Sequence, residues 1–152
     1  VARGAVAWSS SGDFGAAWGP DKAIDGIISD TSKWTSNGAS PTSWMALDLG
    51  AEFRLSGAIV RSAGSAYELA QYNLTDLQVQ TGPSLSGPWT TQFTFSDSHP
   101  RNRAVCLFAS PVDARFVRLL VTDAGIDNHA RVPEFEVYGG EAATGVHGLA
   151  YR

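Results

Sequence analysis

The sequence predicts an all-β fold in which two antiparallel sheets pack as a sandwich or a barrel. Apolar and polar residues alternate with a period of two in many short segments, and 16 glycines and 7 prolines interrupt this alternation at short intervals. No stretch of a dozen residues keeps apolar side chains at the three-and-four spacing of an amphipathic helix. Many short strands joined by glycine and proline turns favour a sandwich or a barrel over a fold of alternating strands and helices.

The strands are expected where the alternation is regular. Residues 44–49 are the clearest case, because Met45, Leu47 and Leu49 can share one face while the residues between them point the other way. The same pattern predicts strands at residues 76–81, 116–121 and 134–138. Further strands are expected at residues 5–8, 57–62, 89–95 and 104–109, which gives about eight in all. The nearest approach to a helix is residues 66–72, which are too few to be stable alone and are expected to form a single turn.

Composition bounds the class of protein. A chain of 152 residues with 43% apolar and 17% charged residues has the size and the apolar content of one domain with a core. No apolar run approaches the ~20 residues of a membrane helix, and the net charge of -4 argues against a surface for nucleic acid or anionic lipid. The single cysteine, Cys106, excludes an internal disulfide and a multi-cysteine zinc site, and its apolar neighbours predict a buried, unreactive thiol.

The regular alternation is lost near the end of the sequence, where glycine and alanine become frequent. We therefore expect a folded module at residues 1–140 and a tail or linker at residues 141–152. No signal segment begins at Val1, so a secretion signal is expected to have been removed or to lie outside this sequence. This organisation is typical of a module from a longer protein.

Three groups of motifs follow one another along the chain. The first is Trp-Gly-Pro-Asp-Lys-Ala-Ile-Asp-Gly at residues 18–26, followed by Asp-Thr-Ser-Lys-Trp-Thr-Ser at residues 30–36. The second is Ser-Trp-Met-Ala-Leu-Asp-Leu-Gly at residues 43–50. The third is Ala-Arg-Phe-Val-Arg-Leu at residues 114–119, followed by Pro-Glu-Phe-Glu-Val-Tyr-Gly at residues 133–139.

Together these motifs resemble the discoidin family, also called coagulation factor 5/8 type C, and its bacterial branch, the family 32 carbohydrate-binding modules. The resemblance runs from about residue 8 to residue 139. It implies an eight-stranded antiparallel jelly-roll β-sandwich, similar to galactose-binding domains, that binds its ligand through loops at one rim.

The segment after residue 22 has the composition of a calcium-binding loop. It offers Asp25, Asp30, Thr31 and Ser32 as oxygen ligands, and Gly26 permits the bend that such a loop needs. In the modules that this chain resembles, a structural calcium ion commonly lies in this loop. The resemblance implies the following ligands: the side chains of Asp25 and Glu134, the carbonyls of Lys22, Ile27 and Pro133, and either Thr31 or Ser32. The alternative is an Asx turn at Asp25, with Glu134 paired to an arginine.

Three loops between the predicted strands carry polar and aromatic side chains suited to sugar recognition, which needs an aromatic face and a few fixed polar groups. In the resembled fold alternate loops reach the same rim, so these loops are expected to converge. The candidates for carbohydrate binding are Tyr67, Glu68, Tyr72, Asn73, His99, Arg101, Asn128, His129 and Arg131. The alternative for each of them is a solvated loop side chain.

Other residues outside these three loops also bear on the rim. Asp13 and Phe14, in the Gly- and Ser-rich loop before Trp18, are expected to close the rim from the other side. By contrast, Trp18, Trp34 and Trp44 lie in motifs that the family uses for structure and are expected in the core.

One departure from the family pattern bears on the sugar. Galactose-binding members often place a histidine and an aromatic residue just after the tryptophan of the calcium loop, but residues 35–38 here are Thr-Ser-Asn-Gly. Their arginine between two central strands has no clear counterpart in residues 67–71, which read Tyr-Glu-Leu-Ala-Gln. A sugar other than galactose, a glucan or an acidic polysaccharide is therefore favoured.

The leading functional prediction is a non-catalytic carbohydrate-binding module of a secreted bacterial polysaccharide-active enzyme. It would be a monomeric module of a multidomain protein that binds a polysaccharide or an oligosaccharide, and neither nucleic acid nor a membrane. The alternative is an adhesion domain, or a lipid- or protein-binding discoidin domain; the acidic charge and the lack of a pair of terminal cysteines argue against it. An enzyme is not expected, because Glu134 and Glu136 are neighbours on one strand and cannot easily straddle a glycosidic bond, and no Gly-x-Ser-x-Gly motif is present.

Overall fold

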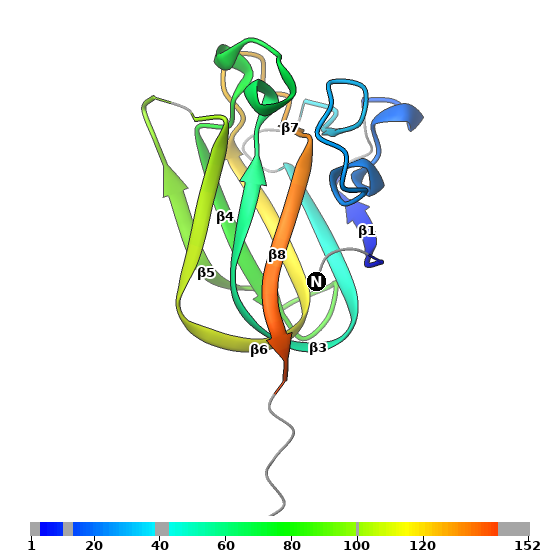
Figure 1. The fold of residues 1–152 in the computed structure, drawn as a ribbon, viewed down its shortest axis with the longest axis vertical. Coiled ribbons are helices and arrows are strands. Elements are labelled where there is room, and N and C mark those ends of the chain that lie inside the picture. The colour runs from blue at the N-terminus through cyan, green and yellow to red at the C-terminus, as the bar shows by residue number, and fades with distance from the viewer. Residues whose placement is uncertain (1–3, 11–13, 39–42, 100, 143–152) are drawn as a thin grey trace, which may run out of the picture.

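The computed structural model, which describes residues 4–10, 14–38, 43–99 and 101–142, has the predicted all-β architecture (Figure 1). Its strands pair antiparallel and form two packed layers. The strands are β1 (Val6–Ser9), β2 (Trp34–Thr35), β3 (Ser43–Arg61), β4 (Asp76–Gly82), β5 (Thr90–Ser96), β6 (Arg103–Asp123), β7 (Arg131–Val132) and β8 (Glu134–Glu141). The expected jelly-roll sandwich is therefore confirmed.

Two long strands, β3 and β6, contribute to both layers. They pair with each other along most of their length, and two register shifts interrupt the ladder. The first half of β3 lies between β1 and the second half of β6, which in turn pairs with β4, and β4 pairs with β5. The second half of β3 lies between β8 and the first half of β6. The strands expected at residues 44–49 and 57–62 are thus two halves of β3, and those expected at residues 104–109 and 116–121 are two halves of β6.

The space between the layers is filled by the faces that the alternation predicts. Leu47 of β3 is fully buried, as are the inward faces of β4, β6 and β8. Of the three tryptophans expected in the core, Trp34 is fully buried, whereas Trp18 and Trp44 are only half-buried. Cys106 lies in the core, which confirms its predicted burial, and this burial raises the pKa of its thiol to about 12.

Short 3₁₀ turns occur in the loops at one end of the sandwich. They are η1 (Ala16–Trp18), η2 (Pro20–Ala23), η3 (Ala63–Ala66) and η4 (Ala70–Tyr72). The single turn expected at residues 66–72 is therefore two turns, with Tyr67 just after the first in a left-handed backbone conformation (φ 68°). In the described part of the chain, none of the helices has the length and apolar content needed to cross a membrane.

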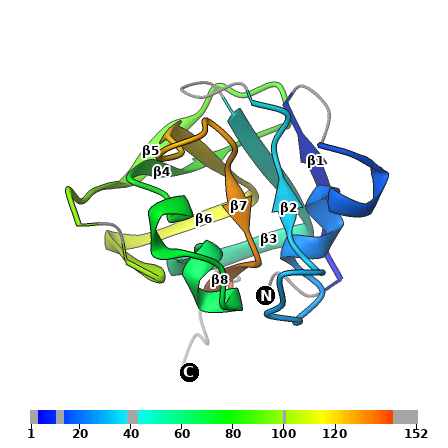
Figure 2. The same ribbon diagram turned by 90° about the horizontal axis from the view of Figure 1, so that it is seen from above.

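The loops that carry the predicted sugar-binding residues lie at this same end, at the top of Figure 1. Figure 2 looks onto it: the segment with η3 and η4 (green), β7 (orange) and the segment with β2 (cyan) lie side by side. β2 and β7 pair, with Trp34 opposite Val132 and Thr35 opposite Arg131. These two-residue strands were not predicted, because two residues are too few to show an alternation.

The boundary predicted between module and tail lies near the end of β8. This strand ends at Glu141, and residues 143–152 of the predicted tail or linker lie outside the described residues.

Candidate functional site

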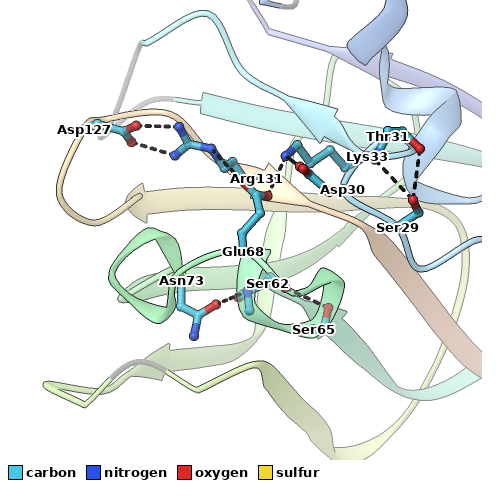
Figure 3. Close-up of polar contacts among 11 residues, drawn as sticks. Ser29, Asp30, Thr31, Lys33, Ser62, Ser65, Glu68, Asn73, Asp127 and Arg131 are labelled. Carbon is cyan, nitrogen blue, oxygen red and sulfur yellow. Dashed lines mark hydrogen bonds and ion pairs between the residues drawn. The ribbon is translucent and has the colours of Figure 1, made fainter.

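Lys33 is a buried charge in the middle of the loop end. Its side chain is only 6% exposed, and its ammonium lies 2.5 Å from Oε1 of Glu68 and also donates to Asp30 (Figure 3). A buried ammonium needs such partners, because removing it from water is costly. Lys33 lies just before β2 and Glu68 lies between η3 and η4, so their contact ties two loops together.

Arg131 of β7 connects the same carboxylate to a third loop (Figure 3). Its guanidinium donates two hydrogen bonds to Asp127, at 2.8 and 2.5 Å, and its Nε lies 3.5 Å from Oε2 of Glu68. The guanidinium carbon also lies 4.4 Å from the centroid of the Tyr72 ring, within cation–π range. The hydrogen bonds from Arg131 hold the pKa of Asp127 below its usual value, so Asp127 is ionised at neutral pH. We call Lys33, Glu68, Tyr72, Asp127 and Arg131 the rim cluster.

The charges of the rim cluster alternate in sign from one side chain to the next. Positive Lys33 lies between Asp30 and Glu68, and positive Arg131 lies between Glu68 and Asp127. Each ionised group thus has an opposite charge beside it, and the arrangement fixes the side chains without concentrating charge of one sign.

His129 and Phe14 form an aromatic pair next to the rim cluster. Nδ1 of His129 lies 2.8 Å from the carbonyl oxygen of Ser36; since a carbonyl only accepts, Nδ1 carries the proton in this bond. The ring of Phe14 meets the imidazole edge to face, with 5.2 Å between the centroids, and the Phe14 residue is 60% exposed. An aromatic surface is therefore held open to solvent by a histidine whose orientation is fixed by the backbone.

The structure brings together part of the predicted sugar-binding set. Glu68, Tyr72 and Arg131 are in the rim cluster, in direct contact through Arg131. Asn128 and His129 lie in the same loop as Asp127, where the Asp127 carboxylate accepts a hydrogen bond from the backbone amide of His129. Two of the three loops that were expected to converge therefore meet in the rim cluster.

The other four predicted residues lie apart from the rim cluster. Asn73 is fully buried; its side chain accepts from the Gly64 amide at 2.7 Å and donates to the side chain of Asn102 at 3.2 Å, so it joins two loops instead of facing solvent. Arg101 pairs with Asp97 at 3.0 Å. The remaining two, Tyr67 and His99, are exposed. Asp13 lies outside the described residues.

Two charged residues of this region, Lys33 and Asp127, were not predicted as site residues from the sequence. Asp30 was expected among the oxygen donors of the calcium loop, and the structure pairs it with Lys33. The only signal for Asp127 was its spacing of four residues from Arg131, and the only signal for Lys33 was its position beside the motif residue Trp34. Neither signal shows that a charge is buried.

The predicted calcium loop brings several of its expected ligands together. Asp25 accepts from the Ser32 hydroxyl at 2.5 Å and from the Ile27 amide at 2.8 Å, the second bond being that of an Asx turn. The Glu134 carboxylate reaches the same loop and accepts from the Gly26 amide at 3.1 Å.

The two candidate hydroxyl ligands differ in position. Ser32 is buried against Asp25, whereas Thr31 is exposed and bonds to the hydroxyl of Ser29 at 3.0 Å (Figure 3). The geometry therefore favours Ser32.

The donor set of this loop consists of oxygen atoms. In the described part of the chain, no three His, Cys, Asp or Glu side chains gather as a metal cluster, so a cation would depend on two carboxylates supplemented by hydroxyl and carbonyl oxygens. Lys22, Ile27 and Pro133 flank Asp25 and Glu134 along the chain and offer carbonyls, and the Ile27 side chain is exposed. Calcium prefers such a shell, and the residues present fit it.

Comparison with solved structures reveals close similarity of fold. The family 32 carbohydrate-binding module of Streptococcus pneumoniae EndoD superposes with a TM-score of 0.77 at 18% identity, over 91% of this chain and 97% of that one. Chitosan-binding module 2 of a chitosanase/glucanase from Paenibacillus sp. IK-5 was solved in complex with chitotriose. It superposes with a TM-score of 0.74 at 25% identity, over 91% of this chain and 98% of that one. The family 32 module of C. perfringens NanJ, in complex with galactose, superposes with a TM-score of 0.72 at 18% identity, over 88% of this chain and 92% of that one.

The sequence was also compared with curated proteins and with family models. No curated protein matches the chain. The model of the F5/8 type C domain matches residues 5–135, which include the strands β1 to β7 and the start of β8. The chain therefore belongs to the F5/8 type C domain family.

Proposed function

We propose that this protein is a non-catalytic carbohydrate-binding module that binds a glycan at the loop end of the sandwich. The observation that carries the proposal is the exposed Phe14 ring, held by His129 next to the rim cluster. An aromatic face can cover the apolar side of a pyranose, and fixed polar side chains beside it can bond its hydroxyls. The family, and the sugars bound by the Paenibacillus and NanJ modules, support this assignment.

The charge pattern of the rim favours a neutral sugar at this site. Lys33, Glu68, Asp127 and Arg131 are already paired with one another or with Asp30, so a charged ligand would have to displace an existing ion pair. Hydroxyl groups can bond to the remaining lone pairs and N–H groups without displacing them. We expect modest affinity, in about the micromolar to millimolar range, because a solvated site gains little beyond the cost of ordering the ligand.

A structural calcium ion is part of the proposal. Asp25, Ser32 and Glu134 would hold it, with carbonyls of Lys22, Ile27 and Pro133 completing the shell. The ion would fix the loop that precedes Lys33 and would take no part in sugar chemistry.

The wider setting of the module is also proposed. It would belong to a secreted bacterial enzyme acting on a polysaccharide and would hold that enzyme near its substrate. The support is that one similar module derives from a chitosanase/glucanase.

Binding to a glycan array followed by calorimetry tests the sugar site. The wild-type protein should bind a subset of neutral glycans, and Phe14→Ala and His129→Ala should each weaken that binding by about tenfold, because the aromatic face is lost. Val6→Ala is the matched control, since Val6 is a similarly exposed apolar residue on β1 and its loss should leave affinity unchanged. Wild-type affinity in both rim variants, or no glycan bound by the wild type, would overturn the proposal.

Thermal unfolding with and without a chelator tests the calcium ion. If the free calcium concentration is about 100 times the Kd of the native state, chelation should lower the melting temperature by about 5–10 °C. Asp25→Asn should already melt at the lower temperature and should no longer respond to the chelator. An unchanged wild-type melting curve would refute calcium binding.

A further inference from the structure

A second hollow lies beside the loop end and has a different chemistry from the rim cluster. It has a volume of about 710 Å³ and is lined by strands β3, β5 and β6 and the loops above them. We call it the arginine pocket, and its defining residues are Arg61, Tyr67, Phe95, Arg101, Asn102 and Arg103. None of these residues belongs to the rim cluster.

Like charges face each other across two strands of this pocket. Arg61 and Arg103 are directly opposite in the antiparallel pairing of β3 with β6, so their side chains emerge on the same face. Like charges in this position destabilise a sheet, because their side chains are close neighbours. This pair of positive side chains therefore gathers on one face of a chain whose net charge is -4.

The carboxylates around the pocket neutralise two of its three arginines. Arg61 donates through Nε to Glu136 at 2.6 Å, and Arg101 donates through Nε to Asp97 at 3.0 Å. Arg103 is exposed and has no ion pair with any described residue. The pocket thus retains one positive charge, together with the terminal N–H groups of the two paired guanidinium forks.

The electrostatic influence of Arg103 is visible on its neighbour Glu136. Burial by itself would raise the pKa of Glu136, but the hydrogen bonds from Tyr138 and Arg61 and the positive charges of Arg61 and Arg103 bring it below the usual value. Glu136 is therefore ionised and already paired with Arg61, so the positive charge of Arg103 remains available to a ligand.

Tyr67 places an aromatic ring at the edge of the pocket. The residue is 98% exposed, although burial of an aromatic ring is normally favourable. It also adopts a left-handed conformation that a non-glycine residue takes at a cost. An exposed ring in a costly conformation beside three arginines is suited to contact with a ligand.

An apolar surface continues from the pocket along the outer face of the layer that contains β8. Val105 lines both the arginine pocket and a smaller hollow of about 210 Å³, which Leu107, Ile59 and Tyr138 also line. Leu107 is 70% exposed. A sugar ring attached to an anionic group in the pocket could therefore rest its apolar face on this surface.

We propose that the arginine pocket binds the carboxylate or sulfate group of an acidic glycan, with the sugar ring lying against Tyr67 and the apolar surface at Val105. The charge that Arg103 leaves uncompensated selects an anion, and forked guanidinium groups match the geometry of carboxylate and sulfate oxygens. The choice of a glycan as the carrier of the anion rests on the proposed function, whereas the anion site itself is separate from the rim.

Paired charged and neutral polymers test this site at about 0.15 M salt, where long-range attraction between surface charges is screened. Polygalacturonate is compared with its methyl ester, and dextran sulfate with dextran, in each case by affinity electrophoresis and calorimetry. The wild-type protein should bind at least one charged polymer and bind its neutral counterpart more than tenfold more weakly. Which of the two charged polymers binds distinguishes a uronate from a sulfate.

Two substitutions that each remove one positive charge distinguish binding in the arginine pocket from general electrostatic attraction between the protein and the polymer. Arg103→Gln should weaken binding of the charged polymer about tenfold or more, while Arg54→Gln, which removes an exposed arginine at the opposite end of β3's second half, should change it less than twofold. Phe14→Ala should leave this binding intact, so loss of the rim site and loss of the arginine pocket are distinguishable. Equal weakening by Arg103→Gln and Arg54→Gln, or no preference of the wild type for either charged polymer, would overturn the proposal.

Discussion

The rim cluster and the arginine pocket lie at the same end of one sandwich and are built from the same kinds of residue, yet their charges are arranged in opposite ways. In the rim cluster, buried Lys33 and half-buried Arg131 alternate with carboxylates. In the arginine pocket, Arg61 and Arg103 face each other on neighbouring strands. The first arrangement stabilises the loops, whereas the second costs stability, a cost that we attribute to the proposed anion site. A substitution in each region should therefore have effects of opposite kind.

The largest effect on stability is expected from Glu68→Gln. Among the described residues, it leaves the ammonium of Lys33, which is almost wholly buried, with Asp30 as its one charged partner, and it removes the carboxylate beside Arg131. We expect a loss of about 3 kcal/mol in the free energy of unfolding, measured by chemical denaturation, because a buried charge that loses its partner is strongly destabilising.

A matched substitution on the same ammonium tests this reasoning. The Asp30 side chain is 60% exposed, so Asp30→Asn should cost less than about 1 kcal/mol. The double variant Lys33→Met/Glu68→Gln should regain part of the loss, because it removes the unpaired buried charge. Equal costs for Glu68→Gln and Asp30→Asn would show that burial does not set the value of these pairs.

A smaller and pH-dependent effect is expected from Asp127→Asn. Because hydrogen bonds from Arg131 lower the pKa of Asp127 in the folded state, this carboxylate contributes stability above the unfolded pKa of about 4, and the contribution is lost as the pH falls through the lower folded pKa. At pH 7 the variant should be less stable than the wild type by less than about 1 kcal/mol, since the pair is partly exposed. The difference between the two proteins, followed by thermal unfolding, should shrink below pH 4; a difference independent of pH would contradict this.

The smallest effect on stability is expected from Arg103→Gln. Removing one of two facing like charges should leave the free energy of unfolding unchanged or raise it by about 0.5 kcal/mol. Chemical denaturation next to Glu68→Gln provides the direct comparison. A clear loss of stability would mean that Arg103 is a structural residue and that the two regions are alike.

The fold was predictable because its core strands alternate regularly. The inward residues of β4 and β8 and the two halves of β3 and β6 were identified from period-two patterns. The pattern did not reveal that two segments form the single strand β3 and two others form β6. The alternation is interrupted between them, where the pairing of β3 with β6 shifts register.

The candidate site was predictable in location and only partly in composition. Glu68, Tyr72 and Arg131 could be chosen because they lie in loops that the fold brings to one end. Lys33 could not, because its burial depends on Glu68, which lies 35 residues away in the sequence. Arg61 and Arg103 were also missed, since facing positions on two strands follow from register and not from composition.

The buried amide of Asn73 has a consequence for redesign of the rim. It fastens the segment at Gly64 and reaches across to Asn102, so two neighbouring loops share one hydrogen-bonding centre. A side chain in place of Gly64 would collide with Asn102. Attempts to transplant a new sugar preference should therefore exchange both loops together with Asn73, because either loop transferred alone would arrive without the partner that shapes it.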